Sequence, residues 1–123
     1  MNIQPTYVTF EQAKLLKEKG MIVSCGAYQI EEGNRLIDWR YTPATFKLTP
    51  HFLPAPEQWQ VVEWLRIKHN IWIEAMKSYG VNGIYKYCID TSNKFQLVET
   101  EYKFKSPQEA YSAAFDYVLK ELI

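Results

Sequence analysis

The residue types best suited to bind a ligand gather between positions 39 and 51. Trp39, Arg40 and Tyr41 are consecutive there, and Lys47 and His51 follow. Aromatic faces together with an arginine suit the stacking of a base and the holding of a phosphate. The same residue types dominate binding energy at protein–protein interfaces. A second interpretation stays open, because strand alternation would bury Trp39 and Tyr41 in the core and leave Arg40 at the surface.

The chain around this cluster is rich in proline, with Pro43, Pro50, Pro54 and Pro56. We expect these prolines to prevent regular structure and to pre-order the loop, which lowers the entropy cost of binding. Long loops are often functional, although an ordered connection that wraps the core explains the same pattern. The helix expected next adds an aromatic and a basic residue on its outer side. The predicted binding surface comprises Trp39, Arg40, Tyr41, Lys47, His51, Trp59 and Arg66.

Metal binding and catalysis have no signature in this chain. Cys25, His51, His69 and Cys88 lack the spacing of metal ligands. We expect both cysteines to be reduced, buried thiols, and His69 to gain from the dipole at a helix end. We therefore predict no catalytic residue, no metal and no cofactor. A small enzyme whose site assembles only in space is kept as an alternative.

Two helices are predicted in the first half of the chain. Residues 10–19 follow a capping box made by Thr9 and Gln12 and precede Gly20, which is typical of a helix end. Residues 56–69 begin with a proline, which suits the first position of a helix because its missing N–H has no partner there.

A third helix is predicted over residues 107–122. Ser106 and Glu109 give it a capping signal at its start. Ala110 and Ala114 lie on one face, where small side chains let a helix pack closely against a sheet.

Five segments alternate in hydrophobicity and predict strands. Residues 71–76, 83–89 and 95–104 are separated by short turns, one of them at 90–93, which favours an antiparallel meander. Residues 21–30 and 35–41 predict a hairpin. The prediction is an α+β fold: an antiparallel sheet with helices on one face, and an αβββα-like C-terminal part preceded by a helix and a hairpin.

The length and the charge of the chain limit the classes of protein to which it can belong. A chain of 123 residues fits a single domain over residues 1–123. The 14 basic and 14 acidic residues cancel, which argues against strong nonspecific binding of nucleic acid. No apolar run approaches the roughly 20 residues that span a bilayer, and residues 1–9 do not resemble a signal peptide. We expect a cytoplasmic protein.

From position 56 onward the expected order is α-β-β-β-α, ending in an alanine-rich helix. This order resembles that of a double-stranded-RNA-binding domain, whose last helix is also alanine-rich and follows a similar turn. That family grips phosphates with a lysine cluster at the start of the last helix, where this chain has Ser106, Pro107, Gln108 and Glu109. The resemblance implies the topology and, as an alternative function, a module that contacts nucleic acid.

A second resemblance covers most of the chain. It rests on the strings YVTFEQA from position 7, PAPEQWQVVEWLR from position 54 and SPQEAYSAAFDY from position 106. These strings are similar to small uncharacterised proteins of phages and prophages of gut bacteria. Accessory phage proteins of this size often bind and block host components, so the resemblance implies a context but no site residues.

The leading hypothesis is a non-enzymatic phage accessory binding protein that acts in counter-defence or host modulation, in the cytoplasm of the bacterial host. Its expected ligand is a host protein or a small nucleotide-like molecule. We expect no membrane partner, and self-association is left open.

Overall fold

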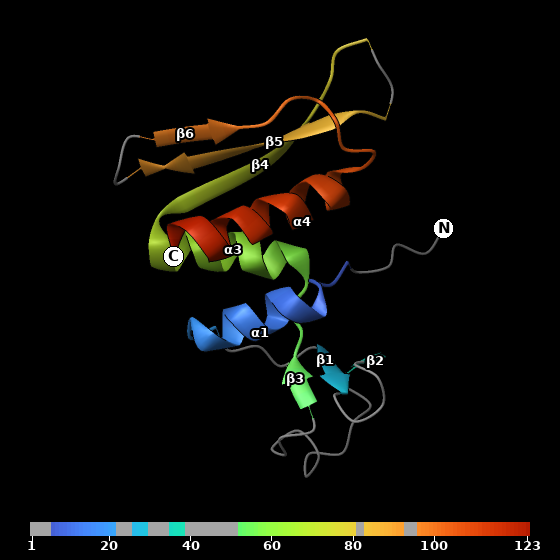
Figure 1. Ribbon diagram of the computed structural model, residues 1–123, viewed down its shortest axis with the longest axis vertical. Helices are drawn as coiled ribbons and strands as arrows, with labels where there is room; N and C mark the ends of the chain where they lie inside the picture. Colours follow the sequence, from blue (N-terminus) through green and yellow to red (C-terminus); the bar gives the residue numbers. More distant parts are fainter. Residues whose placement is uncertain (1–5, 22–25, 30–34, 39–51, 81–82, 93–95) are drawn as a thin grey trace. The chain divides into compact units, whose positions relative to one another are not determined.

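The computed structural model describes residues 6–21, 26–29, 35–38, 52–80, 83–92 and 96–123. Its elements group into two compact units, Met1–Glu57 and Gln58–Ile123, each with its own sheet. The fold is α+β, as the sequence predicted (Figure 1). That the whole chain is one domain stays a prediction.

In the first unit, α1 (Phe10–Glu18) is closed at both ends by local hydrogen bonds. The Gln12 N–H donates to Thr9 Oγ1 at 3.2 Å, and the Thr9 N–H donates to Gln12 Oε1 at 3.0 Å. Gly20 has φ +95°, which lets the Gly20 and Met21 N–H groups donate back to Lys17 and Leu16. The predicted capping box and glycine stop are confirmed, and the helix ends one residue earlier than expected.

The sheet of the first unit contains the predicted hairpin. Strands β1 (Gly26–Gln29) and β2 (Arg35–Asp38) pair antiparallel, with Gln29 opposite Arg35. A third strand, β3 (Phe52–Pro54), pairs with the other side of β1. The prediction that the proline-rich stretch lacks regular structure is wrong for these residues. Pro54 is the last residue of β3, which lies at the edge of the described sheet, where proline is tolerated.

The second unit holds the antiparallel meander that the alternation predicted. Strands β4 (Ile71–Lys77), β5 (Tyr85–Thr91) and β6 (Gln96–Glu99) lie in that order. The strand ends differ from prediction. Thr91 lies in β5 rather than in a turn, because it pairs with Gln96 and its hydroxyl donates to the Gln96 carbonyl at 3.0 Å.

The last predicted strand, over residues 95–104, is interrupted. After β6 ends at Glu99, Thr100 Oγ1 accepts a hydrogen bond from the Tyr87 N–H at 3.2 Å. The backbone pairs with β5 again at Phe104, which bridges Tyr85. A threonine hydroxyl therefore replaces part of the backbone ladder at this point.

Helix α3 (Gln58–His69) begins two residues after the predicted start at Pro56. Pro56 and Glu57 are still extended, because the Val8 N–H donates to the Pro56 carbonyl at 3.1 Å and Tyr7 bridges Glu57. The pairing of these two residues with the segment before α1 thus delays the helix.

Helix α4 (Pro107–Tyr117) begins where the sequence predicted. Ser106 Oγ accepts from the Glu109 N–H at 3.1 Å. The helix widens into a π-helical turn, η4 (Val118–Leu122), where the Ile123 N–H donates to the Val118 carbonyl.

Both helices of the second unit lie on one side of its sheet (Figure 1), as predicted. Ala110 and Ala114 on α4 are fully buried, which lets the helix approach β4 and β5 closely. Val61 and Leu65 complete this core from α3.

We expect Ala114→Leu to lower the free energy of unfolding by about 1–3 kcal/mol, because extra methylene groups must force the helix away from the sheet. Denaturant unfolding measures the change. Ala113→Leu, at the neighbouring half-buried position, is the control and should cost less. Equal effects of the two substitutions would contradict the close packing of Ala114.

Candidate binding surface

The residues predicted to bind a partner fall into two groups. Trp39, Arg40, Tyr41, Lys47 and His51 lie outside the described residues, so that their role stays a prediction. Trp59 and Arg66 lie on α3.

The two α3 residues are on the outer side of the helix, away from Val61 and Leu65. The Trp59 side chain is 62% exposed. Arg66 is partly exposed, and its Nη2 lies 2.7 Å from Glu63 Oε2, one helical turn earlier. The guanidinium lowers the pKa of the Glu63 carboxyl through this hydrogen bond. The orientation that the sequence predicted for both residues is therefore observed.

A second surface emerges on the side of the β4-β5-β6 sheet that faces away from α3 and α4. We call it the open face. Strand alternation sends every other side chain there, whereas Ile71, Ile73, Tyr87 and Ile89 turn to the covered side and are buried. The open face carries Trp72, Glu74, Met76, Lys86, Cys88, Asp90, Leu97 and Glu99.

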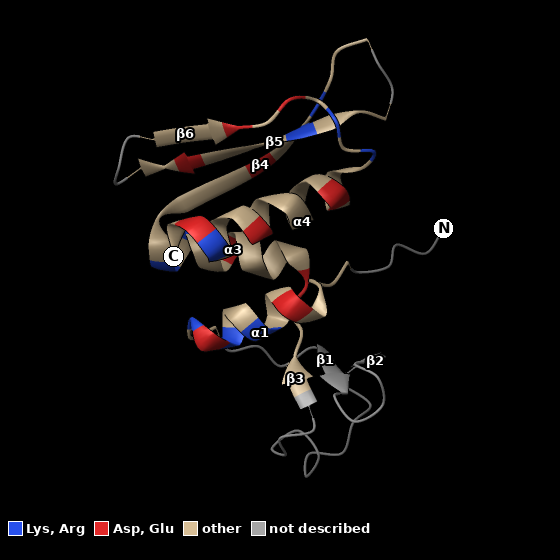
Figure 2. Ribbon diagram, viewed as in Figure 1, with Lys and Arg blue, Asp and Glu red and all other residues tan. Residues whose placement is uncertain are grey.

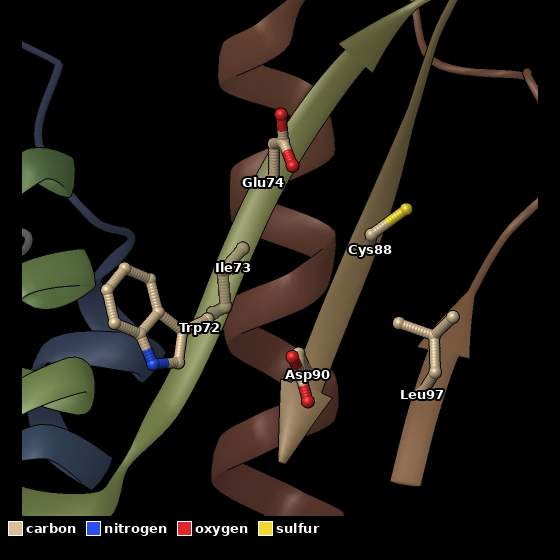
Figure 3. Close-up of a pocket in the computed structure, with 6 residues that line it drawn as sticks. All are labelled: Trp72, Ile73, Glu74, Cys88, Asp90 and Leu97. Carbon is tan, nitrogen blue, oxygen red and sulfur yellow. The ribbon is translucent and has the colours of Figure 1, made fainter. Parts of the chain in front are cut away.

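Two apolar side chains flank a carboxylate at one end of the open face. Trp72 on β4 is directly opposite Asp90 on β5, and Asp90 is opposite Leu97 on β6. Trp72 is 51% exposed and Leu97 is 64% exposed. Together with Glu74, Cys88 and Asp90 they line a hollow of about 510 Å³ (Figure 3). The hollow combines exposed apolar surface with acidic groups.

The Trp72 ring contacts a cation from α3. The Arg66 guanidinium carbon lies 5.4 Å from the ring centroid, within the range of a cation–π interaction. Because Arg66 is itself paired with Glu63, the three side chains form a connected row from helix to sheet. This contact favours one orientation of the Trp72 ring.

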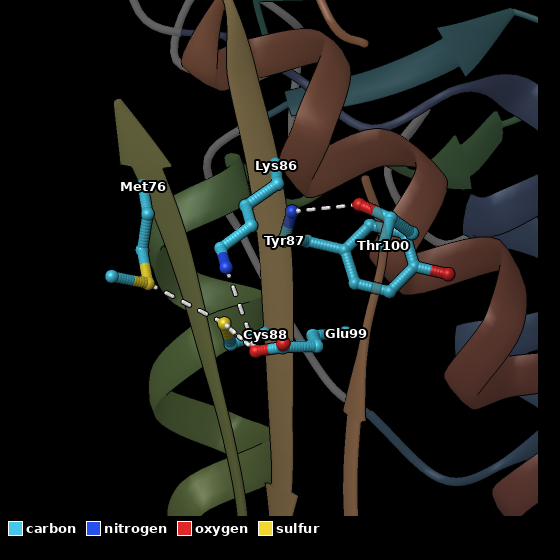
Figure 4. A network of polar contacts seen from close by, with 6 residues as sticks. All are labelled: Met76, Lys86, Tyr87, Cys88, Glu99 and Thr100. Atoms are coloured by element: carbon cyan, nitrogen blue, oxygen red, sulfur yellow. Dashed lines mark hydrogen bonds and ion pairs between the residues drawn. The ribbon is translucent and has the colours of Figure 1, made fainter. Parts of the chain in front are cut away.

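The next rows of the open face are linked through Cys88 (Figure 4). Its Sγ lies 3.4 Å from Met76 Sδ and 3.5 Å from Glu99 Oε2. Lys86 Nζ lies 3.6 Å from the same carboxylate and 4.8 Å from the Tyr102 ring centroid. The basic group of this face is therefore engaged by its own neighbours.

Figure 2 marks the charged residues along the strands, and by register those on the open face are predominantly acidic. Glu74, Asp90 and Glu99 supply three carboxylates, and Lys86 supplies one ammonium group. Glu99 is paired with Lys86, whereas Glu74 and Asp90 make no ion pair with any described residue. Two carboxylates beside the hollow thus have no cationic partner among the described residues.

The expected state of the cysteines is partly corrected. Cys88 is half-buried on the open face rather than fully buried, and it forms no disulfide with a described residue. Burial raises the pKa of the Cys88 thiol, and the adjacent Glu99 carboxylate raises it further. The group is therefore a poor nucleophile near neutral pH. Cys25 lies outside the described residues.

The remaining candidates for catalysis or metal binding were His69 and the acidic residues. His69 ends α3, where its ring meets the edge of Trp64 with centroids 4.8 Å apart. Among the described residues no three His, Cys, Asp or Glu side chains gather as metal ligands. In the same part of the chain, no helix has the length and apolar character needed to cross a bilayer.

The alternation over residues 71–76 places Trp72 on the strand face opposite Ile71 and Ile73, but Trp72 was not predicted from the sequence as a binding residue. The available signal was a strand with apolar residues at both alternating positions. Such a strand is either buried on both sides or exposes apolar surface on one. Asp90 was missed because it was predicted to lie in a turn.

No protein-family model, curated protein or solved structure matches this chain.

The surroundings of Cys88 predict its reactivity. In a Cys25→Ser background, we expect the pH midpoint of Cys88 alkylation by iodoacetamide to lie above the value of free cysteine, about 8.5. Glu99→Gln should lower that midpoint, because it removes a neighbouring negative charge that disfavours the thiolate. Mass spectrometry follows the reaction at each pH. Glu101→Gln is the control; an equal shift in both variants would contradict a specific role of Glu99.

Proposed function

We propose that this chain is a non-enzymatic binding protein and that its open face docks on a protein of the host cell. The observation that carries the proposal is the exposed pair Trp72 and Leu97, on either side of Asp90. Tryptophan is enriched among the residues that dominate interface energy, and pairing with a partner would remove this apolar area from water.

The contact between Arg66 and Trp72 supports a docking role. A side chain that is already ordered loses little conformational entropy when a partner covers it. Arg66 and Trp59, both predicted from the sequence as binding residues, lie on the helix that precedes Trp72 in the chain. The surface would then extend from the open face toward α3.

The acidic character of the open face favours a protein over the small nucleotide-like ligand also expected from the sequence. Phosphate groups are repelled by carboxylates such as those of Glu74 and Asp90, which have no ion-pair partner among the described residues. The proposed biological role is counter-defence or modulation of the host from within its cytoplasm. It comes from the resemblance to phage and prophage proteins.

The proposal is tested by placing a photo-crosslinking phenylalanine analogue at Leu97 in cells of the bacterial host. We expect a discrete cross-linked protein, absent when the analogue replaces the fully exposed Tyr79 in the turn after β4. With that partner purified, Trp72→Ala should weaken binding by about 2 kcal/mol or more in calorimetry, as at other interface hot spots. Thermal unfolding of the same variant controls for folding.

Two results would contradict the proposal. One is identical cross-linking from Leu97 and Tyr79, and the other is partner affinity unchanged by Trp72→Ala. Cross-links to nucleic acid, with an affinity that falls steeply as salt rises, would favour the RNA-binding alternative instead.

A further inference from the structure

The open face has a charge pattern that specifies the partner more closely. Its exposed apolar residues occupy the same end of the sheet as Glu74 and Asp90, which make no ion pair with a described residue. A purely apolar partner segment would cover Glu74 and Asp90 without satisfying them, which is costly. A partner that brings a positive charge to the same place avoids this cost.

The register of the strands shows where such a charge would sit. Trp72 is opposite Asp90 and Glu74 is opposite Cys88, so that Glu74 and Asp90 are diagonal neighbours on one face. Diagonal neighbours of a sheet are roughly 7–8 Å apart, a separation that two acidic side chains can close around one cation. Figure 3 shows both side chains beside the hollow, with Trp72 and Leu97 on its two flanks.

We infer that the segment docked on the open face is basic, with a lysine or arginine side chain between Glu74 and Asp90 and apolar neighbours on Trp72 and Leu97. This inference rests on the proposed function, since it names the chemistry of the partner at the same surface. Arginine fits best, because its planar fork can donate to two carboxylates at once. Its stem also covers apolar surface while its head reaches the charges.

Other occupants of the open face are disfavoured by the same charges. A second copy of the chain, face to face, would oppose three carboxylates with three more and offer one engaged lysine from each side. A nucleic acid would bring phosphates against Glu74 and Asp90. The lysine present, Lys86, already contacts Glu99 and Tyr102.

The test uses two short capped peptides in a nuclear magnetic resonance titration of the isotope-labelled full chain. One peptide has an arginine between leucines, and in its twin the neutral isostere citrulline replaces the arginine. We expect the arginine peptide to shift the Trp72 indole and Leu97 amide signals and to bind about tenfold more tightly than its twin.

A matched pair of variants separates local from general electrostatics. Glu74→Gln combined with Asp90→Asn should weaken binding of the arginine peptide about tenfold and leave the citrulline peptide unchanged. The control combines Glu18→Gln with Glu121→Gln, which changes net charge equally at exposed positions that are not among the residues of the open face. Its affinity for both peptides should match that of the unchanged protein.

Several results would overturn the inference. They are equal affinities for the two peptides, signal shifts that map elsewhere, no shift at millimolar peptide, or equal losses in the two double variants. A dimer of the chain that is abolished by Trp72→Ala in sedimentation would assign the open face to a second copy.

Different results would overturn the basic segment and the docking role. A cross-linked partner at Leu97 whose affinity ignores the Glu74 and Asp90 substitutions would overturn the basic segment and keep the docking role. The absence of any specific cross-link at Leu97 would remove the docking role itself.

Discussion

Close packing of α4 against β4 and β5 is the constraint on which the second unit depends. Ala110 and Ala114 are fully buried and let the helix approach the sheet. Because α3 and α4 cover one face only, strand alternation fixes which side chains are left on the other face. Trp72, Asp90 and Leu97 are therefore exposed as a consequence of how the core is filled.

Much of the fold follows from local sequence signals. Thr9 with Gln12, and Ser106 with Glu109, make the hydrogen bonds that their spacing predicts, so that α1 and α4 begin where expected. Alternation likewise identified the hairpin and the meander. The errors occur where a distant partner decides the local structure. Pro56 stays extended because of Val8, and Thr91 stays in its strand because of Gln96.

The candidate binding surface was harder to predict from the sequence than the fold. Clustering along the chain drew attention to residues 39–51, whereas the open face assembles residues from three strands. Only the register brings Trp72, Asp90 and Leu97 into one row. The sequence did predict that Trp59 and Arg66 lie on the outside of α3, because helical periodicity alone determines that side. The sequence could not predict that Arg66 would lie over Trp72, because that contact depends on the geometry of the turn between α3 and β4.

The interrupted pairing after β6 affects the fraction of molecules in which the open face is complete. β6 is the short outer strand of the meander, and beyond its end at Glu99 the Tyr87 N–H bonds to the Thr100 hydroxyl instead of a backbone carbonyl. Such a strand separates from its sheet at a lower free energy than the strands beside the helices. When β6 separates, Leu97 is no longer beside Asp90, and the hollow loses one of its two apolar walls. Any partner that needs that wall binds only the closed population, and by binding it slows amide exchange in β6.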